Sequence, residues 1–175
     1  MEIIDLKKFD ENLKKISEEI KSEVDKINLD KIPLCEFKLS EYEKLDTFSS
    51  TTKEGIYIFY IQKESLDKFE IKWGNNIKKA TPKIIKNRIK DHTNTIDWIP
   101  LYIGKSEKVI SRIAQHITLK KESTTSSMKL RAREKFNEDI FAVRIIPLKT
   151  EHYSFIAHYI ESELRKIINP IVGKK

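Results

Sequence analysis

The sequence contains a single cysteine, Cys35, among its 175 residues. One cysteine excludes an intrachain disulfide and a cysteine-based zinc site, and it is typical of proteins from a reducing compartment. The longest apolar run, Ile56–Ile61, is far shorter than the roughly 20 residues of a membrane-spanning helix. The first ten residues, MEIIDLKKFD, lack the apolar region of a signal peptide. These absences predict a cytoplasmic protein without a membrane span.

Positive charge is what the sequence has in excess. Charged residues make up 35% of the chain, the net charge is +7 and the pI is near 9.3. Such a surplus favours a polyanionic partner, nucleic acid first and an anionic membrane surface second. Residues 62–99 hold nine Lys and Arg but only five Asp and Glu, so more than half of the surplus lies there. A hydrophobic content of 39% is enough for one modest core.

Residues 5–28 form the longest periodic segment and predict an amphipathic helix. Its apolar residues recur at steps of three and four: Leu6, Phe9, Leu13, Ile16, Ile20, Val24 and Ile27. Packing of this stripe on the helix's own domain is the preferred interpretation. The alternative is half of a helical dimer interface, which would make the protein a homodimer.

Aromatic and β-branched runs predict strands at Gly55–Ile61, Pro100–Ile103 and Phe141–Leu148, with a further one at Phe69–Trp73. Helices are expected at three other places: from Thr81-Pro82 through Lys90, over Met128–Phe136, and over Glu151–Ile168. The buried stripe of the last helix should consist of Tyr153, Ile156, Ile160, Leu164 and Ile167.

The segment 100–117 has the pattern of a strand, a turn and a helix. Gly104 should end the strand, and Ser106 should cap the helix through its hydroxyl. Lys108, Arg112 and His116 are each four residues apart and should form a cationic stripe beside the apolar face. Such a stripe can meet a phosphate, or it can simply be solvated.

Two tripeptides, Gly55-Ile-Tyr57 and Tyr102-Ile-Gly104, together resemble the paired signature of the GIY-YIG nuclease superfamily. Further residues follow in the order of that superfamily. Arg112 lies ten residues after Tyr102, His116 four further on, and Glu161 nine residues before a proline. Ser126–Leu130 is similar to a segment of phage homing endonucleases of this superfamily. The resemblance covers residues 55–173.

The chain departs from the family pattern in three places. Tyr57 and Tyr102 are 45 positions apart, and the insertion at 62–99 resembles the restriction-enzyme branches. Gly173 stands where the family often has asparagine, and Thr125 where homing relatives have histidine.

The resemblance implies an α/β (α+β) fold with a small antiparallel three-stranded sheet flanked by helices. It places the nuclease domain at residues 51–175, after an N-terminal helical extension at 1–50.

The resemblance also implies roles for five residues. Glu161 would hold Mg²⁺, with Mn²⁺ as a substitute, because one carboxylate with several retained waters is ordinary for Mg²⁺. Arg112 would bind the phosphate through its planar fork. Tyr57 would be the general base, its pKa lowered by Arg112 and by His116 as cations, and Tyr102 would orient the water or the phosphate. The two tyrosines can exchange roles, and spacing alone does not separate Glu161 from Glu163.

The expected function is Mg²⁺-dependent cleavage of DNA, most simply double-stranded, with no membrane as partner. Contacts to nucleic acid are expected from Lys105, Lys83, Lys86, Arg88, Lys90, Lys129 and Arg131. The alternatives are a non-catalytic nucleic-acid-binding module on the same fold and an RNA-cleaving enzyme. By composition alone the two tyrosines would be core residues, and Arg112, His116 and Glu161 surface residues.

Overall fold

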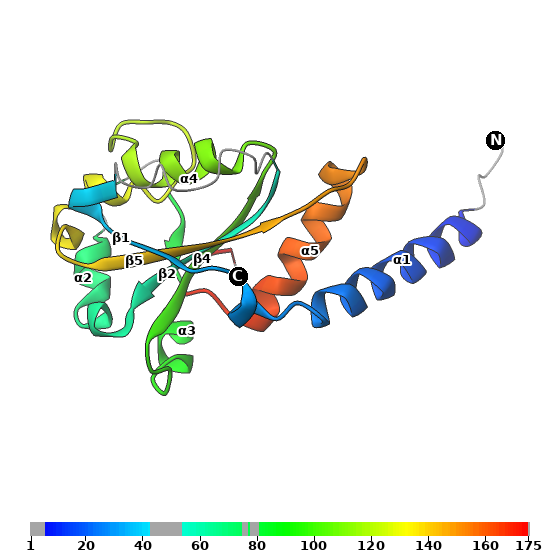
Figure 1. Ribbon diagram of the computed structural model, residues 1–175, viewed down its shortest axis with the longest axis horizontal. Helices are drawn as coiled ribbons and strands as arrows, with labels where there is room; N and C mark the ends of the chain where they lie inside the picture. Colours follow the sequence, from blue (N-terminus) through cyan, green and yellow to red (C-terminus); the bar gives the residue numbers. More distant parts are fainter. Residues whose placement is uncertain (1–5, 43–53, 75–76, 78–80, 175) are drawn as a thin grey trace.

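The computed structural model describes residues 6–42, 54–74, 77 and 81–174. It has a four-stranded antiparallel sheet in the order β1-β5-β2-β4 and a separate pair of strands, β3 and β6 (Figure 1). The strands are β1 (Cys35–Lys38), β2 (Gly55–Gln62), β3 (Lys83–Ile84), β4 (Trp98–Ser106), β5 (Ile140–Pro147) and β6 (Val172–Gly173). The helices are α1 (Lys7–Asp25), α2 (Phe69–Trp73), α3 (Lys86–Asp91), α4 (Val109–Thr118) and α5 (Tyr153–Ile168).

The expected three-stranded sheet is wrong by one strand. β1 pairs with β5 at the edge of the sheet, and only one of its side chains, Phe37, is buried. Such a short strand with one buried residue leaves little periodic signal in the sequence. β1 lies within the expected N-terminal extension, so that segment contributes to the main sheet. The expected domain boundary at residues 50 and 51 lies outside the described residues.

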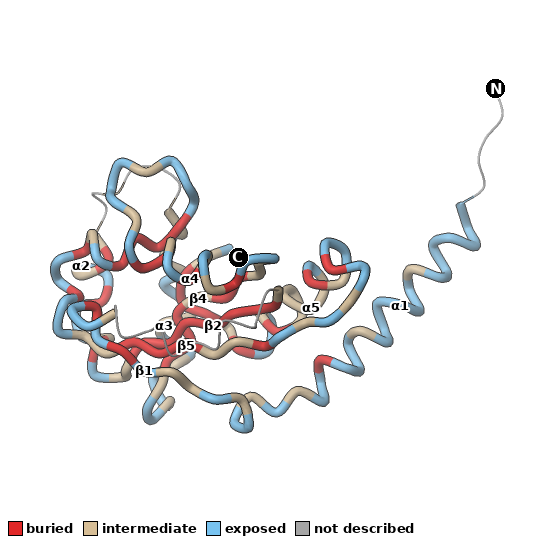
Figure 2. The backbone as a smooth tube through the Cα atoms, turned by 45° about the horizontal axis from the view of Figure 1, so that its top comes forward, coloured by how far each residue is buried: buried red, intermediate tan, exposed pale blue. Residues whose placement is uncertain are grey.

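β2 is the centre of the molecule because it has a strand on each side and a hydrophobic layer on each face. Its backbone runs through the buried part of the chain (Figure 2). Tyr57, Phe59 and Ile61 point to one face, and Ile56, Ile58 and Tyr60 to the other. Seven of its eight residues are buried, which explains why this strand is an unbroken apolar run in the sequence.

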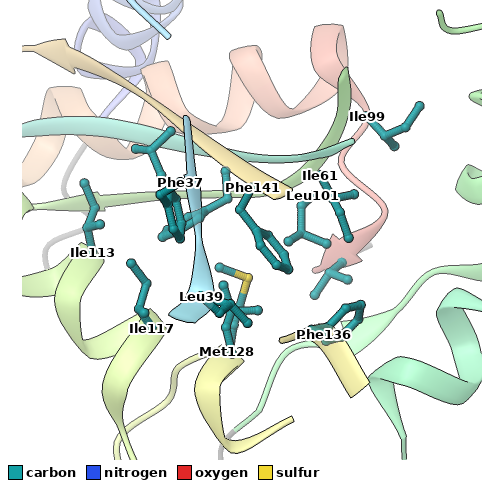
Figure 3. Packing of buried hydrophobic residues seen from close by; sticks show 14 of the residues in the cluster. Phe37, Leu39, Ile61, Ile99, Leu101, Ile113, Ile117, Met128, Phe136 and Phe141 are labelled. Atoms are coloured by element: carbon teal, nitrogen blue, oxygen red, sulfur yellow. The ribbon is translucent and has the colours of Figure 1, made fainter. Parts of the chain in front are cut away.

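The first face of the sheet packs against α4 and against the segment that follows it (Figure 3). Val109, Ile113 and Ile117 come from α4, and Met128 and Phe136 from the segment. The opposite face packs against α5 and the end of α1. The buried residues of α5 are Tyr153, Ala157, Leu164 and Ile168, whereas Ile167, predicted to be buried, is 58% exposed.

β4 carries an irregularity that positions two residues. Phe59 pairs with Tyr102 but Tyr60 pairs with Pro100, so Leu101 is an extra residue in β4. Bulges of this kind redirect side chains, and here Leu101 enters the core while Tyr102 is only partly buried.

Gly104 does not end its strand as predicted, because β4 continues to Ser106 and Gly104 pairs with Tyr57. A Cβ atom at Gly104 would lie 2.3 Å from Tyr57 Oη. The glycine is therefore needed for the space that it leaves to the phenol. Ser106, predicted to cap the next helix, accepts a hydrogen bond at 3.0 Å from the N–H of Lys108, just before α4 begins.

Three further predictions of secondary structure are wrong, for residues 69–73, 81–90 and 128–136. Phe69–Trp73 is a helix, in which Phe69 and Trp73 stack with ring centroids 5.5 Å apart. The helix expected from Pro82 begins only at Lys86, because Lys83 and Ile84 pair with β6.

Residues 128–136 form two 3₁₀ turns, Leu130–Ala132 and Glu134–Phe136, instead of one helix. Lys129 has a left-handed φ of 54° there, which an α-helix does not allow.

α1 confirms the predicted helix but not its predicted packing. Val24 is buried and Ile20 and Ile27 pack on the α5 side of the sheet. The rest of the helix leads away from the body, and Leu6, Phe9 and Ile16 are 54%, 56% and 40% exposed (Figures 1 and 2). In the part of the chain that the structure describes, none of the helices has both the length and the apolar character needed to cross a bilayer.

Candidate active site

A cleft of about 490 Å³ lies beside β4, which is an edge strand of the main sheet. Four of the five predicted catalytic residues line it: Tyr57 from β2, Tyr102 from β4, Arg112 from α4 and Glu161 from α5. Thr81–Lys83 and Gly173 line it too, so the insertion and the C-terminal strand both contribute to its wall.

His116, the fifth predicted residue, is completely buried behind the two tyrosines. Its Nε2 lies 2.9 Å from Tyr57 Oη, and its ring centroid lies 5.5 Å from that of Tyr57 and 4.8 Å from that of Tyr102. His116 therefore contacts both phenols from the core side and does not belong to the solvent-exposed stripe that its spacing predicted.

The protonation of His116 follows from its second nitrogen. The backbone N–H of Met128 donates to His116 Nδ1 at 3.1 Å, so Nδ1 carries no proton. Burial, and to a lesser degree Arg112, lower the pKa of His116 to about 3. The ring is thus neutral, with its one proton on Nε2, and Nε2–H donates to Tyr57 Oη. This corrects the expectation that His116 acts as a cation.

Tyr57 is correspondingly hard to ionise. Burial, and next the neighbouring Tyr102, raise the pKa of Tyr57 well above its ordinary value, while Arg112 acts in the opposite direction without cancelling them. The pKa of Tyr102 is also raised, by burial and by Glu161. The expected lowering of the Tyr57 pKa is therefore not found, and its phenol is protonated at neutral pH.

Arg112 is held in place by two acceptors. Its Nη1 donates to Gln115 Oε1 at 2.7 Å, and its Nη2 donates to the backbone oxygen of Ser126. A guanidinium has five N–H donors, so these two bonds fix the plane of the group and leave further donors for an anion.

Glu161 and Glu163, which spacing did not separate, have different surroundings. Glu161 lines the cleft and pairs with Arg165, and their side chains are only 13% and 19% exposed. Glu163 pairs with Lys166 at 2.5 Å, away from the cleft. Of these two glutamates, Glu161 is the one that lines the cleft.

The donor set for a metal is small. Within the described ranges, no group of three or more His, Cys, Asp or Glu side chains could hold an ion. Glu161 is the one carboxylate among the described residues that line the cleft. This set fits Mg²⁺, which binds through one or two carboxylates and otherwise keeps water or substrate oxygens as ligands. It does not fit a metal that needs several protein ligands.

The predicted nucleic-acid contacts divide into two groups. Lys83 and Lys105 line the cleft. The others do not: Lys86 pairs with Glu70 at 2.5 Å, Arg88 donates to the Pro170 oxygen at 3.0 Å, Lys90 is exposed on α3, and Arg131 lies 4.4 Å from the Tyr42 ring. Lys129 is buried and donates to the backbone oxygens of Lys121 and Ser123, so it holds the loop before it together and is not presented to a ligand.

Several residues of the cleft were not predicted. Arg165 and Lys174 add two cations to its lining. The Met128 N–H and the Ser126 carbonyl orient His116 and Arg112, and both belong to the segment Ser126–Leu130 that the resemblance had singled out. Gly173 has a φ of +131°, which glycine adopts far more readily than asparagine, and lies beside the Tyr102 ring.

Comparison with known protein families, with curated proteins and with solved structures finds no match to this chain.

The buried His116 predicts a loss of stability in mild acid. An exposed histidine titrates near 6.5 and His116 near 3, so between these values the unfolded chain binds a proton that the folded chain excludes. The free energy of unfolding should be fully retained above about pH 6.5 and should fall by up to about 1.4 kcal/mol per pH unit below it. In urea unfolding across this range, His116→Gln should show a flatter dependence on pH.

The exposed His158 on α5 provides the control, since His158→Gln should keep the wild-type slope. An unchanged slope in His116→Gln would contradict the neutral, buried state of His116.

Proposed function

We propose that this protein is a Mg²⁺-dependent endonuclease of the GIY-YIG type, which hydrolyses phosphodiester bonds of double-stranded DNA in the cytoplasm. One observation carries the proposal: two tyrosines, a fixed arginine and a carboxylate from four separate elements line the same cleft. These are the residues that the paired tripeptides and their spacing single out, although 104 positions separate Tyr57 from Glu161.

The charge of the cleft supports a phosphodiester substrate. Among the described residues, five cationic side chains line it: Lys83, Lys105, Arg112, Arg165 and Lys174. Against them stands one carboxylate, Glu161. A concave surface with this balance attracts a polyanion and concentrates it at the two tyrosines.

Tyr57 is the proposed general base, because its hydroxyl is the one bonded to His116. As the phenolate, Tyr57 would take a proton from the attacking water. His116 would hold that phenolate by donating its Nε2–H, since Nδ1 is occupied by the Met128 N–H. Burial stabilises the neutral phenol, so this hydrogen bond and the cations around the cleft must offset part of that penalty.

Arg112 and Glu161 have the complementary roles. Arg112, oriented by Gln115 and Ser126, would neutralise the charge that develops on the phosphoryl oxygens. Glu161 would hold a divalent cation, which supplies Lewis acidity to the phosphoryl group and the leaving alkoxide. Tyr102, beside Tyr57 with ring centroids 6.3 Å apart, would orient the water or the phosphate.

Two alternatives use the same cleft. RNA would meet the same cations, and a non-catalytic module would bind nucleic acid without cutting it. The fixed Arg112 and the Tyr57–His116 bond favour an enzyme, because tight orientation of these groups brings nothing to simple binding by charge.

We also propose that α1 joins two copies of the chain, since double-strand cleavage needs two cuts. Leu6, Phe9 and Ile16 leave an apolar stripe exposed. The helix carries five lysines and six acidic residues, so it neither attracts a polyanion nor repels a second copy of itself. The stripe has the alternating steps of three and four of a two-helix seam.

The main test is single-turnover cleavage of a labelled duplex with Mg²⁺. Tyr57→Phe keeps the ring and removes the base, so the rate should fall at least about a hundredfold while DNA binding persists. The wild-type rate should rise about tenfold per pH unit from about pH 6 to about pH 9, because the raised pKa of Tyr57 leaves little phenolate at neutral pH.

Tyr60→Phe, on the opposite face of β2, is the matched control and should cut normally. Equal rates for Tyr57→Phe and wild type would remove Tyr57 from the mechanism. A wild type that cuts RNA but not DNA supports the first alternative, and one that binds without cutting either supports the second.

The metal assignment predicts a difference between two neighbouring glutamates. Glu161→Gln should lose at least about a hundredfold in cleavage rate, with DNA affinity in EDTA not reduced. Glu163→Gln should remain close to wild type, because Glu163 lies away from the cleft. Comparable losses in both variants would argue against Glu161 as the single protein ligand.

The role of α1 predicts the oligomeric state. Ile16→Lys places a charge on the exposed stripe and should convert a dimer to monomer in sedimentation velocity. Ser17→Lys adds the same charge one position away, outside the stripe, and should leave the dimer intact. A wild type that is monomeric at tens of micromolar would end the dimer proposal.

A further inference from the structure

We propose that Arg165 makes the binding of divalent metal and of nucleic acid interdependent: it neutralises Glu161 in the free protein and transfers to a phosphate when both ligands arrive. The inference rests on the proposed function, because it takes Glu161 as the metal ligand and a phosphodiester as the substrate. It assigns to Arg165 a role that neither the motif spacing nor the composition indicated.

The observation is the partly buried ion pair between Arg165 and Glu161. Arg165 Nη2 donates to Glu161 Oε1 one helical turn earlier on α5, and both side chains line the cleft. At 19% and 13% exposure, the two charges are screened less by salt than a surface pair would be. Glu161, the one carboxylate among the described residues that line the cleft, is therefore already neutralised by a cation.

This arrangement makes metal binding to the free protein weak. A divalent cation at Glu161 would face the charge of Arg165 at close range, and Lys83, Lys105 and Arg112 around the same cleft add to that repulsion. The protein offers no second carboxylate among the described lining residues to offset it.

A bound phosphodiester changes both the pairing of Arg165 and the number of ligands that are available to the metal. Its anionic oxygens give the Arg165 fork a new partner of the geometry that guanidinium prefers, so Glu161 is freed. The same phosphate supplies oxygen ligands that Mg²⁺ needs beyond one carboxylate. Metal and phosphodiester thus each raise the affinity of the protein for the other. By linkage, the factor by which each raises the other's affinity is the same.

A purely structural role for Arg165 makes the opposite prediction. If Arg165 only held Glu161 in position, its removal would loosen the carboxylate and weaken metal binding. If it competes with the metal, removal of its charge should strengthen metal binding to the free protein. The sign of the change in metal affinity separates the two roles.

The experiment measures Mn²⁺ binding to the full chain without DNA, by the loss of the EPR signal of free Mn²⁺. Arg165→Met keeps an apolar stem and removes the charge, and it should bind Mn²⁺ at least about fivefold more tightly than wild type, the lower range of ordinary coupling. Lys166→Met is the matched control: it removes one charge from the neighbouring pair with Glu163 and should bind Mn²⁺ as wild type does.

A second measurement follows DNA binding in wild type and in Arg165→Met. The affinity of wild type for a fluorescein-labelled duplex is measured by anisotropy in EDTA and in Mn²⁺ at equal ionic strength. Mn²⁺ should raise it at least about fivefold, and the gain should be smaller in Arg165→Met. The proposal is overturned if folded Arg165→Met binds Mn²⁺ no more tightly than wild type. It is also overturned if Mn²⁺ does not raise the affinity of wild type for the duplex.

Cleavage of the same duplex, followed on gels, keeps the two proposals distinct. A metal-dependent affinity for the duplex without any cleavage would contradict the nuclease function and leave the coupling between metal and DNA binding in place. Cleavage without coupling between metal and DNA binding would contradict the role of Arg165 and leave the proposed nuclease function intact.

Discussion

The hydrogen bond between His116 and Tyr57 is the interaction on which the rest of the site depends. It joins α4 to the central strand inside the core, where water cannot replace it. The Met128 N–H fixes its direction, and Met128 itself is packed in the hydrophobic layer beneath the sheet. The segment after α4 therefore determines the hydrogen-bonding state of the phenol in the cleft, and packing and chemistry are set by the same few contacts.

The shape of the cleft results from departures from regular structure. Leu101, the extra residue in β4, enters the core while the adjacent Tyr102 lines the cleft, and the missing side chain at Gly104 leaves room for Tyr57 Oη. Residues of the insertion also line the cleft, where its strand β3 pairs with β6 after the last helix. A long insertion between two strands of one sheet thus becomes part of the wall of the cleft, and it also contributes Phe69 and Trp73 to the hydrophobic core.

Much of this arrangement could be predicted from the sequence, and what could not has physical reasons. β2, β5, α4 and α5 bury long periodic faces, so their patterns are strong. β1 and β3 bury too few side chains to leave a pattern, and Phe69–Trp73 is apolar enough to suit a strand or a helix. Four of the residues that the resemblance singled out line one cleft. The neutral His116, the backbone donors around it and the Glu161–Arg165 pair depend on burial and tertiary contacts, which spacing does not encode.

The pairing of the sheet also bears on how the protein is made. Gly55 is paired with Ser106 on one side and with Pro147 on the other, so the central strand can pair only after segments far along the chain have been synthesised. Contacts of such sequence separation form slowly, because loop closure costs entropy before any pairing repays it. The lysines and arginines of the insertion carry their charge from the moment they are synthesised. An incompletely folded chain therefore carries the positive charge of this segment before its cleft exists, so electrostatic attraction to any polyanion precedes the formation of the cleft.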